Sequence, residues 1–226
     1  VSNSWAYVSP VSQYNLKIRK IQEAADKGII IVFAASNCGE GCGSYTSCCD
    51  GSGRSVFQGC REQDLYRGRG KSIHGPNQIG DVITVAAVDS ENLLREGYSS
   101  QGPSYSPGGL YVLDKPDIAG FADFELRVNG EETNFAGTSA ATPTITGIIA
   151  LMLSANPELK LGEIKNLLFS TAKNDYCTSN TFDCKLDVGY GQANPVQAVL
   201  QAYSLSNNSI CATEDIPCNG IIIPVC

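Results

Sequence analysis

Apolar and polar residues alternate along the chain in a way that predicts both strands and helices. Four short runs of apolar and small residues predict strands, at residues 1–7, 29–35, 82–88 and, as a shorter candidate, 116–119. The unbroken, β-branched run at 29–35 is typical of a central strand in a parallel sheet. Residues 13–27 carry apolar side chains near helical spacing, and Gly28 is expected to end this helix.

Helical patterns dominate the second half of the chain. Residues 138–154 are apolar around almost the whole circumference of a helix, which predicts a helix buried in the core. The segments 161–171 and 195–203 are amphipathic and predict two further helices. Before them, residues 124–128 lead into Asn129-Gly130, a pair that favours a type I′ turn in a β-hairpin.

The order of these elements favours the α/β class, with parallel strands joined by crossover connections. About four strands can be found, and the strand at 1–7 opens the chain with no cap, turn or linker before it. A sheet that stops there would leave an unpaired backbone edge and a bare apolar face. We therefore expect the chain to be part of a domain whose N-terminal strands are missing.

Composition narrows the class of protein further. The sequence is 42% hydrophobic and only 17% charged, which is enough for a core and too little charge for a disordered tail. The net charge of −7 and the lack of basic clusters beyond 67–71 argue against a nucleic-acid partner. Apolar runs such as 147–153 are shorter than the ~18–20 residues of a membrane span. No basic-then-apolar leader opens the chain, so a secretion signal would have been removed or would lie outside it.

Ten cysteines indicate an oxidising compartment. They lie in polar, Gly-rich loops, which predicts disulfide bonds and a secreted or lumenal protein. The alternative is zinc, but the only histidine is His74 and the cysteines do not form two C-x-x-C pairs. Connectivity stays open: Cys177 with Cys184 is the first pair to test, and the adjacent Cys48 and Cys49 are expected to bond to different partners.

A glycosylation signal adds weakly to the argument for secretion. Asn207-Asn208-Ser209 fits the N-glycosylation sequon, although such triplets also arise by chance.

Two segments carry residue types suited to nucleophilic catalysis. Gly137-Thr138-Ser139 opens the predicted helix 138–154, where unsatisfied N–H groups and the positive end of the helix dipole would surround the Ser139 hydroxyl. Asn37 follows the central strand, and ligands bind beyond the carboxyl ends of strands in open parallel sheets. Its amide can donate to a developing negative charge. Taken alone, each segment also fits a structural role, as a helix N-cap or a turn.

Six motifs in this order resemble the subtilisin-like serine proteases (subtilases) over about residues 1–204. They are Asn-Ser-Trp-Ala at 3–6, Ala-Ala-Ser-Asn at 34–37, Val-Ile-Thr-Val-Ala-Ala-Val-Asp at 82–89, Tyr-Ser-Ser-Gln-Gly-Pro at 98–103, Lys-Pro-Asp-Ile at 115–118 and Gly-Thr-Ser-Ala-Ala-Thr-Pro at 137–143. Gly-Tyr-Gly-Gln-Ala at 189–193 is similar to the way this fold ends. The related sedolisins use an aspartate as oxyanion donor, so Asn37 argues against them.

The resemblance implies a three-layer, parallel-sheet α/β fold, incomplete at its N-terminal side and with disulfide-rich loops. Residues 1–204 would be the C-terminal portion of the peptidase domain, with a Cys-rich insertion at about 38–80 that is expected to border the substrate cleft. Residues 205–226 would be a Cys-rich tail. Subtilases often bind calcium, but no loop here shows an ordered ligand series, so no metal residues are predicted.

The resemblance also implies roles for individual residues in cleaving a polypeptide substrate. Ser139 would be the nucleophile, and the Asn37 side chain and the Ser139 N–H would form the oxyanion hole. The substrate would lie as an added strand against Ser4, Trp5 and Ala6. The pocket for the residue preceding the scissile bond would be lined by Ala34, Ala35 and Ser36. Most subtilases have glycine where Ser36 stands, and its side chain would narrow that pocket.

The general base and its orienting carboxylate are the missing part of this picture. Subtilases supply Asp, His and Ser in that order, and the first two would precede residue 1. His74 is followed by Gly-Pro-Asn rather than the family's Gly-Thr and a small-residue helix, and Asp89 comes after it, so neither is expected to be catalytic.

Three interpretations remain open. The chain is the C-terminal portion of an active secreted subtilase, completed by an N-terminal portion or a separate companion chain that carries Asp and His. Alternatively, it is a catalytically inactive subtilase-like binding or structural module. In the third, it is a disulfide-stapled component of an extracellular assembly that has borrowed the fold.

Overall fold

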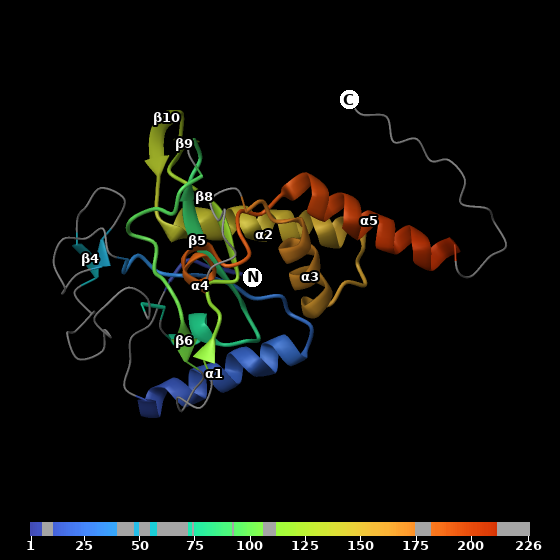
Figure 1. Ribbon diagram of the computed structural model, residues 1–226, viewed down its shortest axis with the longest axis horizontal. Helices are drawn as coiled ribbons and strands as arrows, with labels where there is room; N and C mark the ends of the chain where they lie inside the picture. The colour runs from blue at the N-terminus through green and yellow to red at the C-terminus, as the bar shows by residue number, and fades with distance from the viewer. Residues whose placement is uncertain are drawn as a thin grey trace.

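Four parallel strands form the central sheet (Figure 1). In spatial order they are β1 (Ser2–Asn3), β2 (Val32–Ala34), β5 (Ile83–Asp89) and β8 (Ile118–Ala122). Val32 pairs with Ile83 and Val85 pairs with Ile118, and every pair in the sheet is parallel. The predicted α/β class and the four strands are therefore confirmed.

The computed structural model describes most of the chain outside the Cys-rich loops. The described residues are 1–5, 11–39, 48–49, 55–57, 72–73, 75–91, 93–105, 112–174 and 182–211.

Helices lie on both faces of the sheet. They are α1 (Val11–Asp26), the 3₁₀-helix η2 (Gly75–Gln78), α2 (Thr138–Ala155), α3 (Leu161–Thr171), α4 (Phe182–Val188) and α5 (Pro195–Cys211). Side chains alternate along β2, so Val32 joins the core under α2, α3 and α5, whereas Phe33 joins the core under α1. On the α1 side, a smaller cluster holds Val88 of β5 against Val188 of α4. The result is the three-layer arrangement that the resemblance implies.

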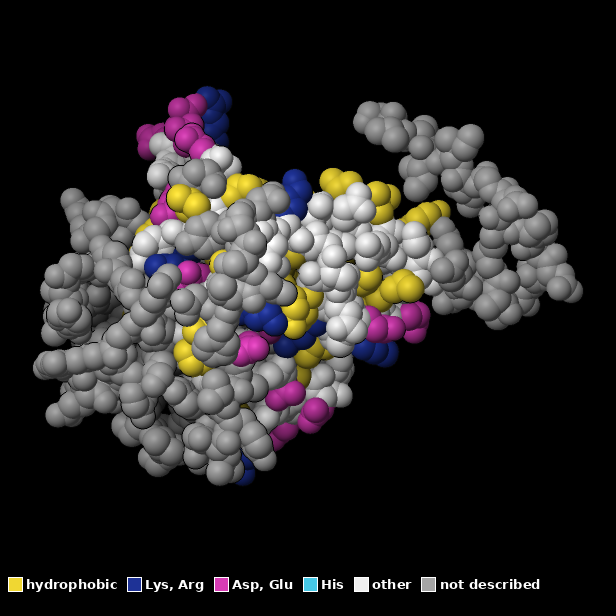
Figure 2. Space-filling model, viewed as in Figure 1, with side chains coloured by type: hydrophobic (Ala, Val, Ile, Leu, Met, Phe, Trp, Pro, Cys, Tyr) yellow, Lys and Arg dark blue, Asp and Glu magenta, His cyan; other side chains and the backbone are white. Residues whose placement is uncertain are grey.

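The predicted hairpin is present and stands away from the sheet. Strands β9 (Phe124–Val128) and β10 (Glu131–Phe135) pair antiparallel. Asn129 and Gly130 have φ values of 54° and 88°, which is the type I′ geometry expected for this pair. Acidic side chains gather on the hairpin in Figure 2, and it leads directly into Gly137 and α2.

Two further short antiparallel pairs complete the strands. One joins β3 (Cys48–Cys49) to β4 (Ser55–Phe57), and the other joins β6 (Ser104–Tyr105) to β7 (Val112–Leu113).

Several predicted element boundaries need correction. Within the described residues 1–5 of the strand expected over 1–7, only Ser2–Asn3 are regular, and α5 continues past its predicted end at residue 203 to Cys211. The boundary predicted between the domain and its tail at 204/205 lies within α5, and the division of the chain into these two parts stays a prediction. The helix α4 was not predicted, because its seven residues are too few to show a period.

The core helix α2 is less completely buried than its composition predicts. Pro143, Gly147, Ala150 and Leu151 lie on an exposed stripe, and Leu151 is 57% exposed. Its opposite side contacts all four strands of the sheet as well as α5. By length and composition α2 is the one helix among the described residues that could cross a membrane, but here it serves as the core helix of the α/β fold.

A buried ionic cluster joins the amino-terminal ends of β5 and β8. The Lys115 ammonium donates to the carboxylate of Asp117 and to the carbonyl of Val82 at 3.0 Å, and the Thr84 N–H donates to the same carboxylate at 2.7 Å. Lys165 of α3 lies 3.6 Å from the other Asp117 oxygen. Burial lowers the pKa of Lys115 to about 8, against the opposing pull of the Asp117 carboxylate.

The structure describes two cysteine side chains. Cys38 and Cys184 are each disulfide-bonded. The other cysteine side chains lie outside the described residues, so the expectations for Cys177, Cys48 and Cys49 stay predictions, as does the sequon at 207–209.

Candidate active site

Ser139 lies at the carboxyl-terminal end of the sheet, as the second residue of α2. The residue that precedes the helix, Gly137, has φ 89°, a conformation that side chains other than glycine's strongly disfavour. A Cβ atom at Gly137 would also lie 2.9 Å from Nδ2 of Asn37. Glycine at 137 therefore allows the turn and the close approach of the Asn37 amide.

Asn37 holds this turn through one end of its amide. Its Oδ1 accepts hydrogen bonds from the Thr138 N–H at 3.0 Å and from the Thr138 hydroxyl at 2.8 Å. Because both partners donate to Oδ1, the orientation of the amide is fixed, with Nδ2 as its donor end. No described residue accepts a hydrogen bond from Nδ2.

The backbone amide of Ser139 is the second unpaired donor. Of the first four amides of α2, Thr138 donates to Asn37, and Ala140 and Ala141 both donate to the Gly137 carbonyl. The Ser139 N–H has no acceptor within the described part of the chain. Two donors that lack acceptors, next to a serine hydroxyl at a helix N-terminus, form an arrangement that can stabilise an oxyanion.

Ser139 also contacts the end of β1. Its hydroxyl lies 3.4 Å from the Ser4 carbonyl oxygen, and the Ser4 hydroxyl donates to the Ser139 carbonyl at 3.0 Å. Trp5 packs edge-on against Phe33 with ring centroids 5.0 Å apart, although 43% of Trp5 remains exposed. Ala6, the third residue predicted to bind substrate, lies outside the described residues.

The segment predicted to line the pocket follows β2 directly. Ala34 and Ala35 are buried, and so is Ser36, which is 8% exposed and has φ 91°. That backbone conformation favours glycine, which is the residue that most subtilases carry there. The unusual residue at 36 therefore imposes local strain beside the candidate site.

Asn77 is a structural residue of the site that sequence reasoning missed. It is fully buried in η2, and its Nδ2 donates to the carbonyl oxygens of Trp5 at 3.1 Å and Ala34 at 2.6 Å. It thus ties the end of β1 to the end of β2, the two sides of the predicted cleft. A single polar residue in a turn carries no signal that could have revealed this role.

Of the two residues rejected from the sequence as triad members, the structure describes only Asp89. Asp89 ends β5, and its Oδ1 accepts from the Glu91 N–H at 2.8 Å, as a turn residue does. His74 lies outside the described residues, which contain no histidine that could serve Ser139 as a base. Nor do the described residues hold a group of three or more His, Cys, Asp or Glu side chains able to bind a metal ion.

Comparison with known proteins identifies the family. The profile of the subtilase family matches residues 1–192, and the chain belongs to that family. It is 31% identical to subtilisin DY of Bacillus licheniformis over 158 residues and 28% identical to the serine protease AprX of Bacillus subtilis over 173 residues. Those matches cover 68% and 67% of this chain but 44% and 32% of the two relatives, so the chain spans less than half of their length.

Solved structures show the same fold. The prenylagaramide maturation protease PagA matches 81% of this chain and 54% of its own, with a TM-score of 0.53 and 20% identity.

Another sequence relative is the calcium-dependent protease of Trichormus variabilis, 28% identical over 165 residues and matched over 63% of this chain and 25% of its own length. At the level of the family, the profile match and the sequence similarity to curated proteases support a serine protease.

Proposed function

We propose that this chain carries the nucleophile and the oxyanion hole of a secreted serine endopeptidase. Ser139 attacks the peptide carbonyl, and the negative charge that develops on the carbonyl oxygen is stabilised by the Asn37 side chain and the Ser139 N–H. The observation that carries the proposal is the pair of donors at the N-terminus of α2 that have no acceptor among the described residues, held there by the Asn37–Thr138 hydrogen bonds.

The substrate binds as an extended strand along the end of β1. The Ser4 carbonyl lies 3.4 Å from the Ser139 hydroxyl and is positioned to accept from a substrate N–H, and Trp5 continues that edge. We also assign substrate binding to Ala6, the next residue in the sequence. Ala34, Ala35 and Ser36 line the pocket for the residue that precedes the scissile bond. The Ser36 side chain narrows that pocket.

The proton of Ser139 passes to a histidine that this chain does not supply. In the proposed complete protease, that histidine and an orienting aspartate come from an N-terminal portion or a companion chain. The exposed apolar stripe of α2 and the outer edge of β1, which pairs with no other described strand, support such a partner. Loss of a triad member lowers the rate by about 10⁴–10⁶, so the chain alone is expected to be inactive.

Secretion and calcium binding belong to the same proposal. The disulfide bonds of Cys38 and Cys184 agree with an oxidising compartment. Calcium binding is supported by the names of the calcium-dependent relatives, and no described residue is assigned to it.

Covalent labelling tests the proposal. In the complete protease, a fluorophosphonate is expected to modify Ser139, and the Ser139→Ala variant should remain unlabelled. The matched control is Ser154→Ala, which changes an exposed serine on the same helix and should leave labelling intact. Absence of labelling in a folded complete protein would reject the nucleophile.

The alternative is a subtilase-like binding or structural module without activity. It is favoured by the single histidine of the chain, which does not match the family motif. This alternative predicts that the portion completing the fold lacks the Asp or the His, and that the Ser139 cleft binds an extended peptide without cleaving it.

A further inference from the structure

The turn that carries Ser139 is held from a second side by Tyr98. The Gly137 N–H donates to the Tyr98 hydroxyl at 3.1 Å, and that hydroxyl donates to Asp123 Oδ2, also at 3.1 Å. A phenol has one proton, so it can donate to the carboxylate and still accept from the amide. Tyr98 is buried, and two hydrogen bonds therefore connect Asp123 to the backbone two residues before Ser139.

Asp123 has an oxygen that lacks a donor. Its Oδ1 is buried and has no hydrogen-bond partner among the described residues. Leaving a buried acceptor unsatisfied costs about 1–3 kcal/mol. Besides burial, hydrogen bonding between the carboxyl groups of Glu96 and Asp123 is one of the causes that raise the pKa of Glu96. Two ionised carboxylates repel each other, but one proton shared by the pair converts the repulsion into a hydrogen bond.

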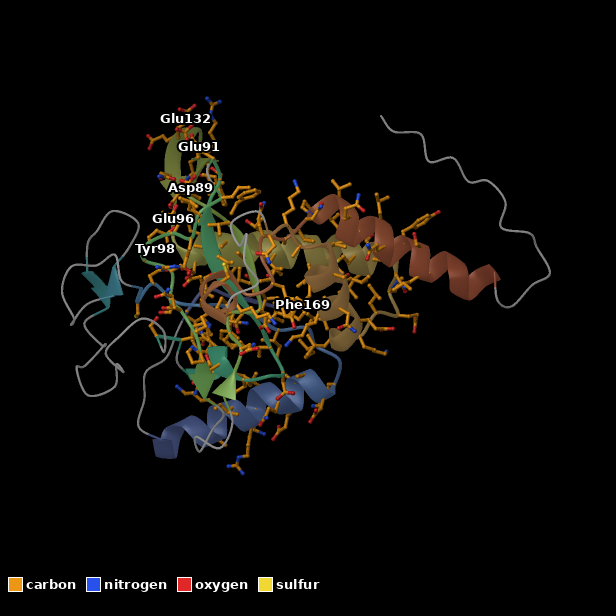
Figure 3. All side chains as sticks on the ribbon, in the orientation of Figure 1. Asp89, Glu91, Glu96, Tyr98, Glu132 and Phe169 are labelled. Carbon is orange, nitrogen blue, oxygen red and sulfur yellow. The ribbon has the colours of Figure 1, made fainter. Side chains whose placement is uncertain are left out.

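The surroundings of Glu96 favour that proton. Partial burial, the neighbouring Asp123 and Asp89 at the end of β5 together raise the pKa of Glu96 to about 7. Tyr98 faces the same pair, and burial with these acids raises its pKa as well, so it stays a neutral donor. Figure 3 shows Asp89, Glu96 and Tyr98 following one another below the β9–β10 hairpin.

One cation, Arg95, lies near Glu96 but opposes this effect only weakly. Its guanidinium donates to the carbonyl oxygens of Glu96, Gly97 and Ser99, at 3.1, 3.4 and 2.7 Å. It also lies 3.7 Å from Asp187, on the side of α4. The cation is therefore engaged with the backbone rather than with the Glu96 carboxyl.

We propose that Glu96 and Tyr98 are positioning residues for the nucleophile, acting through a proton that Glu96 shares with Asp123. The protonated pair keeps Asp123 as an acceptor for Tyr98, and Tyr98 fixes the Gly137 amide and hence the first turn of α2. Loss of the proton leaves two repelling carboxylates and releases this hydrogen-bond chain. The effect on catalysis rests on the proposed role of Ser139, whereas the effect on Gly137 does not.

The sign of the pH dependence follows from the pKa of Glu96. Its value in the folded protein lies above the ordinary value of 4.5, so the folded state keeps a proton that the unfolded state loses. This group therefore lowers stability as pH rises from 4.5 to about 7, and the fixed turn is released as the pH passes through the Glu96 pKa of about 7.

The first experiment reads the Gly137 amide directly and needs no activity. In the complete protein carrying Ser139→Ala, NMR would follow the Gly137 amide and the Glu96 carboxyl from about pH 5 to about 9. Both signals are expected to change with the same midpoint, and the Gly137 change should vanish in Glu96→Gln and in Tyr98→Phe. A midpoint for Gly137 that persists in Glu96→Gln would overturn the proposal, and that variant decides the matter even if Tyr98→Phe does not fold.

The second experiment reads catalysis in the complete protease. Glutamine at 96 still donates a hydrogen bond, so Glu96→Gln should abolish the decline of kcat above neutral pH, while Glu96→Ala should lower kcat about fivefold at every pH with KM unchanged. The control Glu91→Gln changes an exposed acid on the same segment and should leave the profile as it is. An unaltered decline in Glu96→Gln contradicts the proposal. If Ser139 does not act as a nucleophile, the proposed function fails, but the NMR result still decides whether Glu96 and Tyr98 position the Gly137 amide.

Discussion

The two ends of the parallel sheet are stabilised by different kinds of interaction. At the amino-terminal end, Lys115, Asp117 and Lys165 form a buried ionic cluster in which both Asp117 oxygens have cationic neighbours. At the carboxyl-terminal end, neutral hydrogen bonds from Thr138 to Asn37 and from Gly137 to Tyr98 hold the first turn of α2. There the Asn37 Nδ2 and the Ser139 N–H keep no acceptor among the described residues.

The two ends of the sheet therefore contribute differently: the amino-terminal end stabilises the fold, and the carboxyl-terminal end can bind a ligand. A fully paired cluster has nothing left to offer a ligand, whereas unpaired donors at the carboxyl ends of strands can bind one. Substitutions at the two ends should therefore have separable effects, on the free energy of unfolding at one end and on turnover at the other.

The largest effect is expected at the carboxyl-terminal end, from Asn37→Asp. Aspartate keeps the oxygen that accepts from Thr138 but removes the Nδ2 donor, so the turn should stay in place while oxyanion stabilisation is lost. We expect kcat of the complete protease to fall by about 10²–10³ with little change in Tm. Steady-state kinetics and thermal unfolding measure the two quantities. If Tm falls strongly together with kcat, Asn37 acts only as a structural residue.

The next effect is expected at the amino-terminal end, from Lys115→Met. Removing the ammonium leaves the buried Asp117 carboxylate with only the more distant Lys165, so the protein should lose about 3 kcal/mol of stability. Below the unfolding transition, kcat/KM should stay the same. Denaturant unfolding gives the first value, and Lys173→Met, at an exposed lysine, is the matched control with an expected change within about 0.5 kcal/mol. If Lys115→Met and Lys173→Met lose the same free energy of unfolding, the proposed difference between the two ends of the sheet is wrong.

A smaller effect of opposite sign is expected from Ser36→Gly. Glycine relieves the strain of φ 91°, which should outweigh its greater entropy in the unfolded chain and stabilise the protein by up to about 1 kcal/mol. The pocket should also accept larger residues before the scissile bond. Thermal unfolding and cleavage of a peptide series measure these outcomes. Ala35→Gly, at a buried neighbour outside the positive-φ region, should destabilise instead; stabilisation by both changes would disprove the strain.

The sequence predicts the fold well wherever a single local pattern determines an element. The hairpin turn at Asn129-Gly130 follows from two residues that tolerate positive φ, and β5 follows from an unbroken apolar run. The position of Ser139 at the start of α2 could also be predicted, because Gly137-Thr138 marks the helix start. Such signals lie within a few consecutive residues.

Features that depend on distant partners could not be predicted in this way. Asn77 joins Trp5 to Ala34, and Tyr98 joins Gly137 to Asp123, through bonds between residues far apart in the sequence. The exposed stripe of α2 was missed for a related reason: composition shows that a helix is apolar but not which side finds a neighbour. The roles assigned to Ser4, Trp5, Ala6 and Asn37 stay proposals until substrate is bound.

The lysine at 115 gives the sheet a counter-ion that cannot diffuse away. A free cation between Asp117 and the Val82 carbonyl would leave on dilution and could be stripped by a chelator, whereas an ammonium on a side chain stays at the same local concentration as long as the chain is folded. The strand ends that meet there are therefore neutralised as long as the pH stays below the Lys115 pKa of about 8, and their cohesion does not require a free cation from the medium.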